Sequence, residues 1–353
     1  MTTTSQAARR PGVLSVPRRA GFALALALVA GAFLVSVSVG TRQLDFSQVI
    51  TSLITGDQST VAGVVVWKRV PRAVFGLLAG AALGVAGLLM QSVTRNPIAD
   101  PSILGVNAGA SLAVVSGIAF FGITTGFQYI VVSILGAACA AVLVYGVGSA
   151  GRGGATPLKL ALAGTAISMA LSSLVSVIVM PNTQVMDQFR FWQVGSISGA
   201  DWAGIAAFVP VFVAGTIVAL AVAPALEVLS VGDETAVGLG VRPGVIRLVS
   251  SAAAVALCGA TTALAGPVGF VGLMVPHIVC LAHRGSMRSQ VLMCALAGSL
   301  LLLLSDVAGR VLGNALIAPS TELEVGIVTA LIGAPVFIAI AIRAGGGKAL
   351  EVS

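Results

Sequence analysis

Residues 69–109, RVPRAVFGLLAGAALGVAGLLMQSVTRNPIADPSILGVNAG, decide the fold of this chain. An apolar stretch carries Arg69 and Arg72 at one end and the polar turn Arg95–Pro101 at the other, after which a second apolar stretch begins. About 20 apolar residues in helical form cross a bilayer. The segment therefore predicts two membrane helices joined by a proline-containing turn, with a pair of arginines at the far end of the first.

The whole chain has the composition of a membrane protein. Apolar residues make up 57 % of its 353 residues, charged residues make up 9 %, and the mean hydropathy is +1.06. Soluble domains carry about 25 % charged residues, so this chain has too little polar surface to face water. Its apolar runs are continuous rather than alternating, which favours helices over a β-barrel. The predicted fold class is an all-α membrane protein, a polytopic bundle of about ten transmembrane helices.

Ten stretches are long enough, or nearly long enough, to cross a bilayer as helices. Two of them, 267–282 and 291–305, are short, so nine or eleven crossings are alternatives to ten. The ten stretches are 20–40, 73–90, 103–121, 127–147, 160–180, 203–223, 248–265, 267–282, 291–305 and 325–342.

Basic residues predict the orientation of the bundle. With ten crossings and a cytoplasmic N-terminus, 13 of the 19 lysines and arginines fall on the cytoplasmic side, as the positive-inside rule requires. The net charge of +7 then follows from topology and does not indicate a nucleic-acid partner. We expect a multi-pass protein of the cell membrane with both termini in the cytoplasm. Its parts are a tail at 1–19, a single transmembrane domain at 20–345 and a second tail at 346–353.

Small residues are expected to pack the helices together. Gly76, Gly80 and Gly84 recur at every fourth position and therefore share one helix face, where they let another backbone approach closely. The four cysteines all fall in apolar stretches without paired spacing. This pattern predicts core packing for the cysteines, and neither a disulfide framework nor a zinc site.

The sequence holds no constellation typical of catalysis or nucleotide binding. Gly345–Lys348 lacks the spacing of a Walker A motif, no HExxH motif occurs, and His277 and His283 fall on different faces of a helix. We therefore expect no enzyme activity, no metal site and no cofactor bound by this chain. Ion-coupled carriers usually keep carboxylates inside the membrane, and these stretches hold almost none. The chain is expected to take its energy from a partner, and an ion-coupled secondary transporter is the alternative of another class.

Lys68, Arg69 and Arg72 lie at the outer end of the second stretch, against the positive-inside trend, and Arg310 is expected on the same side. Two interpretations are open. Long basic side chains at helix ends reach lipid headgroups, and guanidinium groups also bind carboxylates in a bidentate geometry. In the second case the arginines would steer and orient an acidic protein partner.

Several sequence blocks resemble the FecCD-type permease subunits of ABC importers for iron-siderophores, haem and cobalamin. The match runs in collinear order over roughly residues 20–345, which makes it far more specific than any single motif. The blocks are Arg69–Arg72 with Gln91, Arg95–Pro101, Leu104–Gly105, Gly266–Leu273 with Pro276–His277, Asp306–Arg310 and Gly326–Phe337.

The resemblance implies a ten-helix subunit with the fold of a type II ABC importer permease. It implies a second permease subunit, identical or paralogous, two cytoplasmic ATPase subunits that hold ATP and Mg, and an external substrate-binding protein. The implied substrate is a ferric siderophore, with haem or cobalamin as alternatives. In the family, outer-face arginines at positions like Arg69, Arg72 and Arg310 bind glutamates of the binding protein, so docking is the favoured interpretation.

A short helix is expected between the sixth and seventh stretches, within Glu227–Arg247. Acidic residues suit its N-terminus and glycines its end, although a surface connector would look similar. By resemblance it is the coupling helix, which fits a groove on the ATPase and passes rigid-body motion to the membrane helices. The residues assigned to it are Gly232, Asp233, Glu234, Thr235, Ala236, Gly238, Leu239 and Gly240.

The connector before the fifth stretch, Gly151–Lys159, is predicted to be either a simple turn or, by resemblance, part of an inner gate. Thr156 and Pro157 are its gate candidates. The fifth stretch is expected to line the translocation path, and its polar side chains are Ser168, Ser172, Ser173 and Ser176. Hydrogen bonding of the serines within their own helix or to a neighbouring helix is an equal alternative.

Two positions depart from the family pattern. Cys280 stands where relatives commonly carry an arginine after the Pro–His pair, and Glu324 replaces a common proline. The first change is expected to affect the inner surface. The second adds negative charge near the outer mouth.

Overall fold

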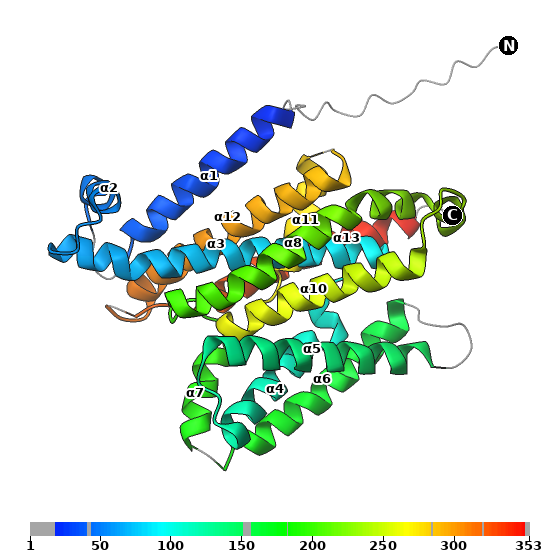
Figure 1. The fold of residues 1–353 in the computed structure, drawn as a ribbon, viewed down its shortest axis with the longest axis horizontal. Coiled ribbons are helices and arrows are strands. Elements are labelled where there is room, and N and C mark those ends of the chain that lie inside the picture. The colour runs from blue at the N-terminus through cyan, green and yellow to red at the C-terminus, as the bar shows by residue number, and fades with distance from the viewer. Residues whose placement is uncertain are drawn as a thin grey trace.

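The computed structural model describes residues 18–40, 44–150, 157–181, 183–283, 285–319 and 321–349. Every regular element in these ranges is a helix, and the long helices run roughly along the longest axis of the molecule (Figure 1). Their bounds are α1 Arg18–Ser38, α2 Phe46–Thr55, α3 Val61–Thr94, η1 Pro101–Leu104, α4 Val106–Phe121, α5 Gly126–Ser149, α6 Pro157–Val179, α7 Thr183–Gln193, α8 Trp202–Val231, α9 Asp233–Gly238, α10 Pro243–Ala265, α11 Val271–Ala282, α12 Met287–Leu316 and α13 Val325–Ala349.

Among the described residues, seven helices are long and apolar enough to cross a membrane, namely α1, α3, α5, α6, α8, α10 and α12. α4, α11 and the first part of α13 are shorter apolar helices. Each of the ten predicted stretches coincides with one of these helices, which confirms the all-helical membrane fold. The stretch 291–305 is not short, because α12 continues at both ends to 30 residues. α11 has only 12 residues, because the chain enters it through a loop in which Phe270 has a φ of 68°.

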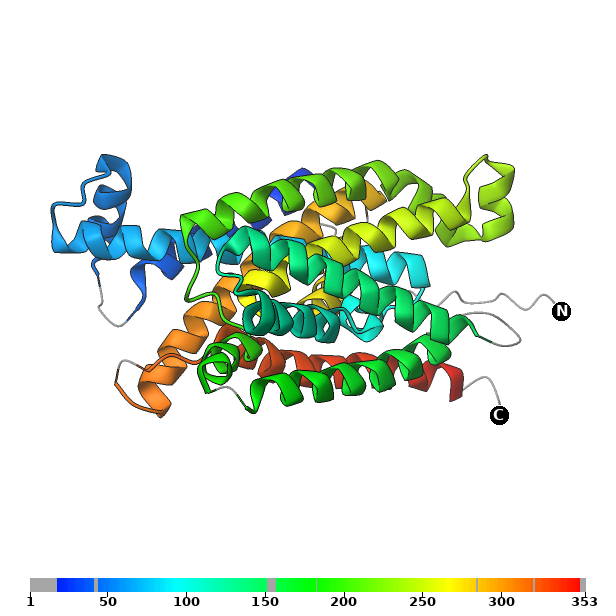
Figure 2. The ribbon, with the colours of Figure 1, turned by 60° about the horizontal axis from the view of Figure 1, so that its bottom comes forward.

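α3 lies at the centre of the bundle and is the most buried of the candidate spans. α12 packs along it, and α10, α11 and α8 contact its other sides. α4, α5 and α6 form a neighbouring layer, which joins the rest mainly where α5 packs on α10 (Figures 1 and 2). With 34 residues, α3 is about 50 Å long. It therefore carries side chains from one end of the molecule to the other.

The predicted glycine face brings α3 into backbone contact with α12. A methyl group added at Gly80 would meet the carbonyl oxygen of Gly298, and one added at Gly298 would meet that of Gly80. Gly84 lies in the same way against the carbonyl of Cys294. Lipid supplies no hydrophobic drive between helices, so this close contact provides van der Waals attraction in its place.

The turn after α3 forms as its sequence predicts. Asn96 Oδ1 accepts a hydrogen bond from the Ile98 amide at 3.1 Å, and Asp100 Oδ1 accepts one from the Ser102 amide at 2.8 Å. Pro101 then begins η1, which leads into α4. Asn96 thus satisfies an amide within the turn, and Asp100 satisfies an amide in the first turn of η1 that has no partner within that helix.

Two short helices were not predicted. α2 begins after Asp45 and ends at Gly56, whose φ of 66° stops the helix. α7 buries Val185 and Phe189 against α4 and α6. They have 10 and 11 residues, so neither is long enough to cross a bilayer.

The cysteines divide into two groups. Cys258 and Cys294 are buried, as core packing predicts, whereas Cys139 and Cys280 are exposed on the surface of the chain. The prediction is wrong for the second pair, because an apolar stretch does not reveal which face of its helix is buried. All four thiols are free.

The two ends of the described chain point the same way. In Figure 1 the start of α1 and the end of α13 both face the end of the bundle that carries α9. α13 continues to Ala349, past the predicted limit of the transmembrane domain at 345. Most of the two predicted tails, residues 1–17 and 350–353, lies outside the described residues.

Candidate functional site

An ion-paired cluster lies toward the α2 end of the bundle, where α3, α12 and the segment before α13 meet. We call Arg72, Asp306, Arg310 and Glu322 the mouth cluster. Arg72 donates from Nε and Nη2 to Asp306 Oδ1, at 3.0 and 2.7 Å, and from Nη1 to Glu322 Oε2 at 2.6 Å. Arg310 Nη2 donates to Asp306 Oδ2 at 2.7 Å. The carboxylate of Asp306 is thus shared by two guanidinium groups, and the four groups carry no net formal charge.

Burial differs among the members of the mouth cluster. The side chains of Asp306 and Arg310 are 1 % and 3 % exposed, that of Arg72 is 13 % exposed, and that of Glu322 is 28 % exposed. A buried charge is tolerated only when it is paired and hydrogen-bonded. Asp306 therefore depends on its arginines, whereas Glu322 is the member with access to water.

Arg310 of the mouth cluster and Arg69, which lies outside it, also hold the end of α1. Arg310 donates to the carbonyl and the hydroxyl oxygen of Ser36, at 2.7 and 2.8 Å. Arg69 Nη1 donates to the carbonyls of Val37 and Ser38, at 3.0 and 2.8 Å. The carbonyls of a last helical turn have no partner within the helix and carry partial negative charge. The two arginines therefore cap α1 and fix it to α3 and α12.

The three arginines predicted for docking, Arg69, Arg72 and Arg310, are thus brought together at one end of the bundle. Arg72 and Arg310 bind carboxylates inside the protein, so the interpretation as headgroup-reaching side chains does not describe them in this structure. Lys68 is exposed and fits that interpretation. The docking role stays a prediction, and it has to account for the carboxylates that already bind Arg72.

Glu322 and the pairing of Arg72 with Asp306 were missed by sequence reasoning. Arg72 lies 234 residues from Asp306 and 250 residues from Glu322, and no spacing rule relates residues so far apart. The pair of Asp306 and Arg310 has i,i+4 spacing on one helix. That spacing is a signal from which an ion pair could have been predicted.

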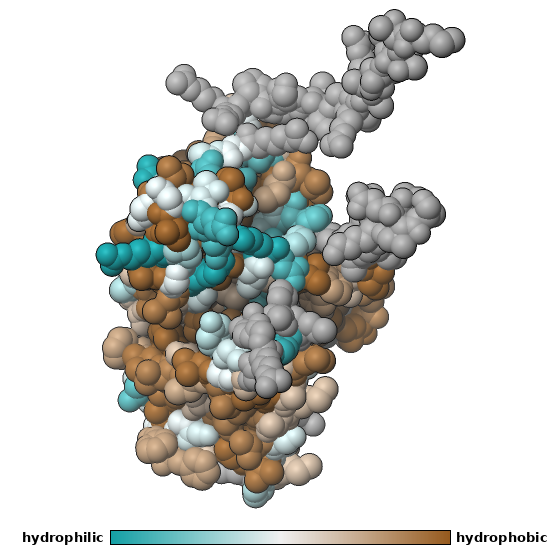
Figure 3. Space-filling model, turned by 90° about the vertical axis from the view of Figure 1, so that its right-hand side faces the viewer, coloured by the Kyte–Doolittle hydropathy of each residue, from teal (hydrophilic) through white to brown (hydrophobic). Residues whose placement is uncertain are grey.

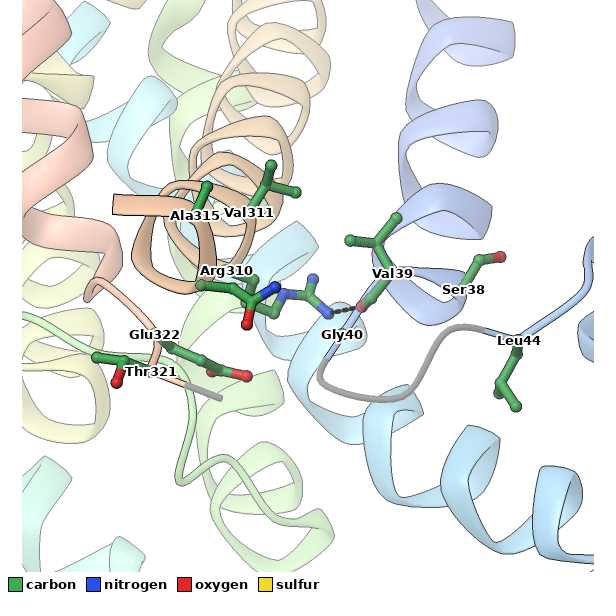
Figure 4. A pocket seen from close by; sticks show the side chains of 10 residues that line it. Ser38, Val39, Gly40, Leu44, Arg310, Val311, Ala315, Thr321 and Glu322 are labelled. Atoms are coloured by element: carbon green, nitrogen blue, oxygen red, sulfur yellow. Dashed lines mark hydrogen bonds between the residues drawn. The ribbon is translucent and has the colours of Figure 1, made fainter. Parts of the chain in front are cut away.

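A cavity of about 430 Å³ lies beside the mouth cluster. Figure 4 shows Arg310 and Glu322 on one side of it and the end of α1, with Ser38 and Val39, on the other. This volume is many times the roughly 30 Å³ that one molecule occupies in liquid water. The cavity therefore has room for an acidic side chain together with water.

α9 lies at the opposite end of the bundle, between α8 and α10 (Figure 2). Its start at Asp233 and its end at Gly238 confirm the predicted short helix. Ala236 is fully buried, whereas Val237 and Leu239 are 61 % and 67 % exposed. Ala236 therefore faces the protein rather than a partner, because one side of so short a helix must pack on its neighbours. Val237 and Leu239 are exposed apolar side chains of α9 and its C-cap, and Val231 and Val245 on the adjoining helix ends are exposed as well.

A second ion-paired cluster fixes α9 in place. Arg95 Nη2 donates to Asp233 Oδ1 and to the carbonyl of Leu229, and Arg247 Nη2 donates to the same Asp233 oxygen at 2.9 Å. Arg95 itself ends α3 in the left-handed conformation, with a φ of 50°. We call Arg95, Asp233 and Arg247 the α9 anchor. It joins α9 to the ends of α3 and α10.

The arginines also set the charge state of Asp233. Partial desolvation raises the pKa of Asp233, and the hydrogen bonds and positive charges of Arg95 and Arg247 outweigh this effect, so its pKa lies below the usual value. Figure 3 views this end of the molecule, where hydrophilic residues gather in the upper half and the α4–α6 side below is largely hydrophobic.

The predicted translocation residues lie on or before α6. Thr156 lies outside the described residues, and Pro157 begins α6. Ser173 and Ser176 donate to carbonyls of their own helix, at 2.9 and 3.1 Å, which confirms the alternative of intrahelical bonding for these two. Ser168 is half-buried and Ser172 is exposed, and their role in the path stays a prediction.

In the part of the chain that the structure describes, no group of three histidine, cysteine, aspartate or glutamate side chains lies where it could hold a metal ion. The functional features are two ion-paired clusters on α3, one at Arg72 in the first half of the helix and one at Arg95, its C-cap. Together with the apolar helices, they define a polytopic membrane protein with two clusters of charged side chains on its central helix.

The chain belongs to the FecCD transport family, whose sequence profile matches residues 26–343. It is 40 % identical over 328 residues to the ferric enterobactin transport system permease protein FepD of Escherichia coli K12, covering 93 % of this chain and 96 % of that protein. It is 38 % identical over 320 residues to the Fe(3+)-citrate import system permease protein YfmD of Bacillus subtilis 168, covering 91 % and 93 %.

A solved structure supports the same assignment. It is described as an inward-facing conformation of a metal-chelate type ABC transporter, and one of its chains matches with a TM-score of 0.77 and 26 % identity. The match covers 93 % of this chain and 100 % of the other. The family expected from the sequence blocks is confirmed, and the chain is a transmembrane permease of that family.

Proposed function

We propose that this chain is the permease subunit of an ATP-driven importer and forms the translocation path for a ferric siderophore. The observation that carries the proposal is the arrangement of α3 in a chain of the FecCD family. The first half of α3 contributes Arg72 to the mouth cluster, toward the α2 end of the bundle, and the C-cap of α3, Arg95, holds α9 at the opposite end. A binding protein would dock at the first end and an ATPase at the second.

The substrate class follows from the relatives. Two of the most similar are named for ferric enterobactin and for ferric citrate, and both names describe a chelate of Fe(III). We assign a ferric siderophore to this chain, with haem or cobalamin as the alternatives. The chain itself carries no catalytic group in this proposal.

The proposed partners at the α9 end are two cytoplasmic ATPase subunits, which hold ATP and Mg. Val237 and Leu239 are large, apolar and exposed, and such side chains favour burial against a partner. Arg242 is exposed at the same end, and Arg95 and Arg247 also lie there. This basic composition supports placing the α9 end, and with it both termini, in the cytoplasm of a cell-membrane protein.

A second permease subunit, identical or paralogous, is proposed to pack against the α6 side. α6 is among the least buried candidate spans, and Leu162, Met169 and Val177 are 62 %, 71 % and 67 % exposed. A translocation path between two subunits would expose Ser172 and Ser168 to the substrate, with Thr156 and Pro157 at its inner end.

Reconstitution tests the proposal. The permease would be purified with the proteins that accompany it in mild detergent and placed in proteoliposomes with its ATPase and binding protein. We expect ATP-dependent uptake of ⁵⁵Fe-labelled ferric siderophore, and competition assays with ferric citrate, haem and cobalamin identify the substrate class. Uptake driven by an ion gradient without any ATPase would overturn the proposal and establish a secondary transporter.

A further inference from the structure

We propose that Glu322 occupies, on Arg72, the place of a carboxylate from an acidic docking partner, so that docking proceeds by exchange of one carboxylate for another. The inference rests on the proposed docking of a binding protein at the mouth cluster. It adds that Glu322 occupies Arg72 as long as the partner is absent. The partner it requires presents an aspartate or glutamate side chain toward Arg72.

The bonds of Arg72 separate a permanent partner from an exchangeable one. Asp306 accepts from both Nε and Nη2 and also binds Arg310, and it is 1 % exposed. Glu322 accepts from Nη1 alone among the guanidinium nitrogens of Arg72, and it is 28 % exposed. Release of Asp306 from Arg72 would leave this buried carboxylate with Arg310 as its one remaining guanidinium partner, which is costly. Release of Glu322 moves a carboxylate into water.

The backbone allows this release without any rearrangement of the helices. Glu322 lies in the irregular segment between α12 and α13. The segment is tied to α12, because the Leu323 amide donates to the Gly309 carbonyl at 3.0 Å, and a side chain at Gly313 would collide with Thr321 and Glu322. Exchange therefore requires rotation of the Glu322 side chain only. The cavity of about 430 Å³ that Glu322 lines gives this rotation the space it needs (Figure 4).

Charge balance makes Glu322 and the partner's carboxylate compete for Arg72. The four groups of the mouth cluster are neutral with Glu322 in place, and the positive charge of the nearby Arg69 is directed at the carbonyls of Val37 and Ser38. A partner carboxylate added to the intact cluster would place three carboxylates against Arg72 and Arg310 as docking excludes water, and an uncompensated buried charge is unfavourable. If Glu322 leaves as the partner arrives, the cluster stays neutral. The strength of the bond between Arg72 and Glu322 then sets the threshold for docking.

The test is binding of the importer's own substrate-binding protein, loaded with ferric siderophore, to the complete importer in lipid nanodiscs. Glu322→Gln removes the competing charge and keeps the size of the side chain. We expect it to tighten binding about fivefold, the scale of one partly exposed ion pair. Glu324→Gln is the matched control, since it removes a carboxylate from the same segment whereas Arg72 bonds to Asp306 and Glu322. The affinity of the Glu324→Gln importer for the binding protein should stay close to that of the wild type.

The outcomes distinguish the exchange from the docking site itself. Arg72→Gln should weaken binding. If Arg72→Gln weakens binding and Glu322→Gln leaves it unchanged or weakens it, the exchange is refuted and the docking site stands. If Arg72→Gln changes nothing, the proposed docking site fails. A structure of the wild-type complex decides the matter without any variant: the exchange requires a partner carboxylate on Arg72 and Glu322 displaced, and Glu322 still bound to Arg72 would overturn it.

Discussion

Arg95, which ends α3, donates a hydrogen bond to Asp233, which begins α9, although the two residues are 138 positions apart in the sequence. The first half of the same helix carries Arg72 of the mouth cluster. A single helix of 34 residues therefore links the two ion-paired ends of the molecule. Because packed helices move as rigid bodies, a displacement of α3 changes both clusters together.

Removal of the charge on Asp233 should loosen α9. In Asp233→Asn the side chain keeps its size and loses its ion pairs with Arg95 and Arg247. We expect ATP hydrolysis to continue with less substrate carried per ATP, measured in proteoliposomes as the ratio of uptake to hydrolysis. Glu234→Gln is the control, because it removes the neighbouring exposed carboxylate while both arginines remain on Asp233. An equal loss in the two variants would show that charge at this end matters and that the α9 anchor does not.

The α9 anchor also predicts that the effect of Asp233→Asn on coupling is independent of pH near neutrality. The folded-state pKa of Asp233 is lowered from its usual value of 3.8. A lowered pKa stabilises the folded state above the unfolded-state value, and this contribution is lost as the pH falls through the folded-state value. Between about pH 5 and pH 8 Asp233 therefore stays charged, and the difference in coupling between wild type and Asp233→Asn should not change. A difference that disappears by pH 6 would contradict this assignment.

Arg310 should be a major determinant of stability. In Arg310→Gln the buried carboxylate of Asp306 loses one of its two guanidinium partners, and the end of α1 loses its cap. Breaking a buried pair in this way costs about 3–5 kcal/mol, which thermal unfolding in detergent would detect. Lys68→Gln removes an exposed charge and should have little effect. The double variant Asp306→Asn with Arg310→Gln restores charge balance and should recover part of the loss.

The sequence predicted the parts of this architecture that depend on local pattern. Each of the ten apolar stretches coincides with an apolar helix, and the acidic start of α9 predicted that short helix. The spacing of Gly76, Gly80 and Gly84 predicted a face for close helix contact, although it did not identify α12 as the partner. The bonds from Arg72 to Asp306 and Glu322 depend on how distant helices pack, which no local pattern contains. The burial of Ala236 was missed for a related reason, since a helix of six residues has too few positions to show which face packs inward.

The contact between Gly80 and Gly298 should be intolerant of side chains. Gly80→Leu places a side chain against the Gly298 carbonyl and forces α3 and α12 apart, and overpacking of this kind costs about 1–3 kcal/mol. Gly31→Leu is the matched control, because Gly31 lies on the exposed surface of α1 with nothing within 4 Å of an added methyl group. The melting temperature in detergent should fall for the first variant and stay near that of the wild type for the second. Equal melting temperatures would contradict the packing of α3 on α12.

The exposed face of α9 gives the sharpest test of the proposed ATPase interface. Val237 and Leu239 are exposed apolar residues of α9 and its C-cap, and Ala236 behind them is buried. Val237→Glu and Leu239→Glu place a charge where an apolar contact is proposed, and burying an unpaired charge is unfavourable. We expect both variants to insert into the membrane and to retain less ATPase on purification. Val245→Glu, at an exposed position early in α10, controls for added charge at the same end. ATPase retained by both α9 variants as in the wild type would place the nucleotide-driven partner elsewhere on the molecule.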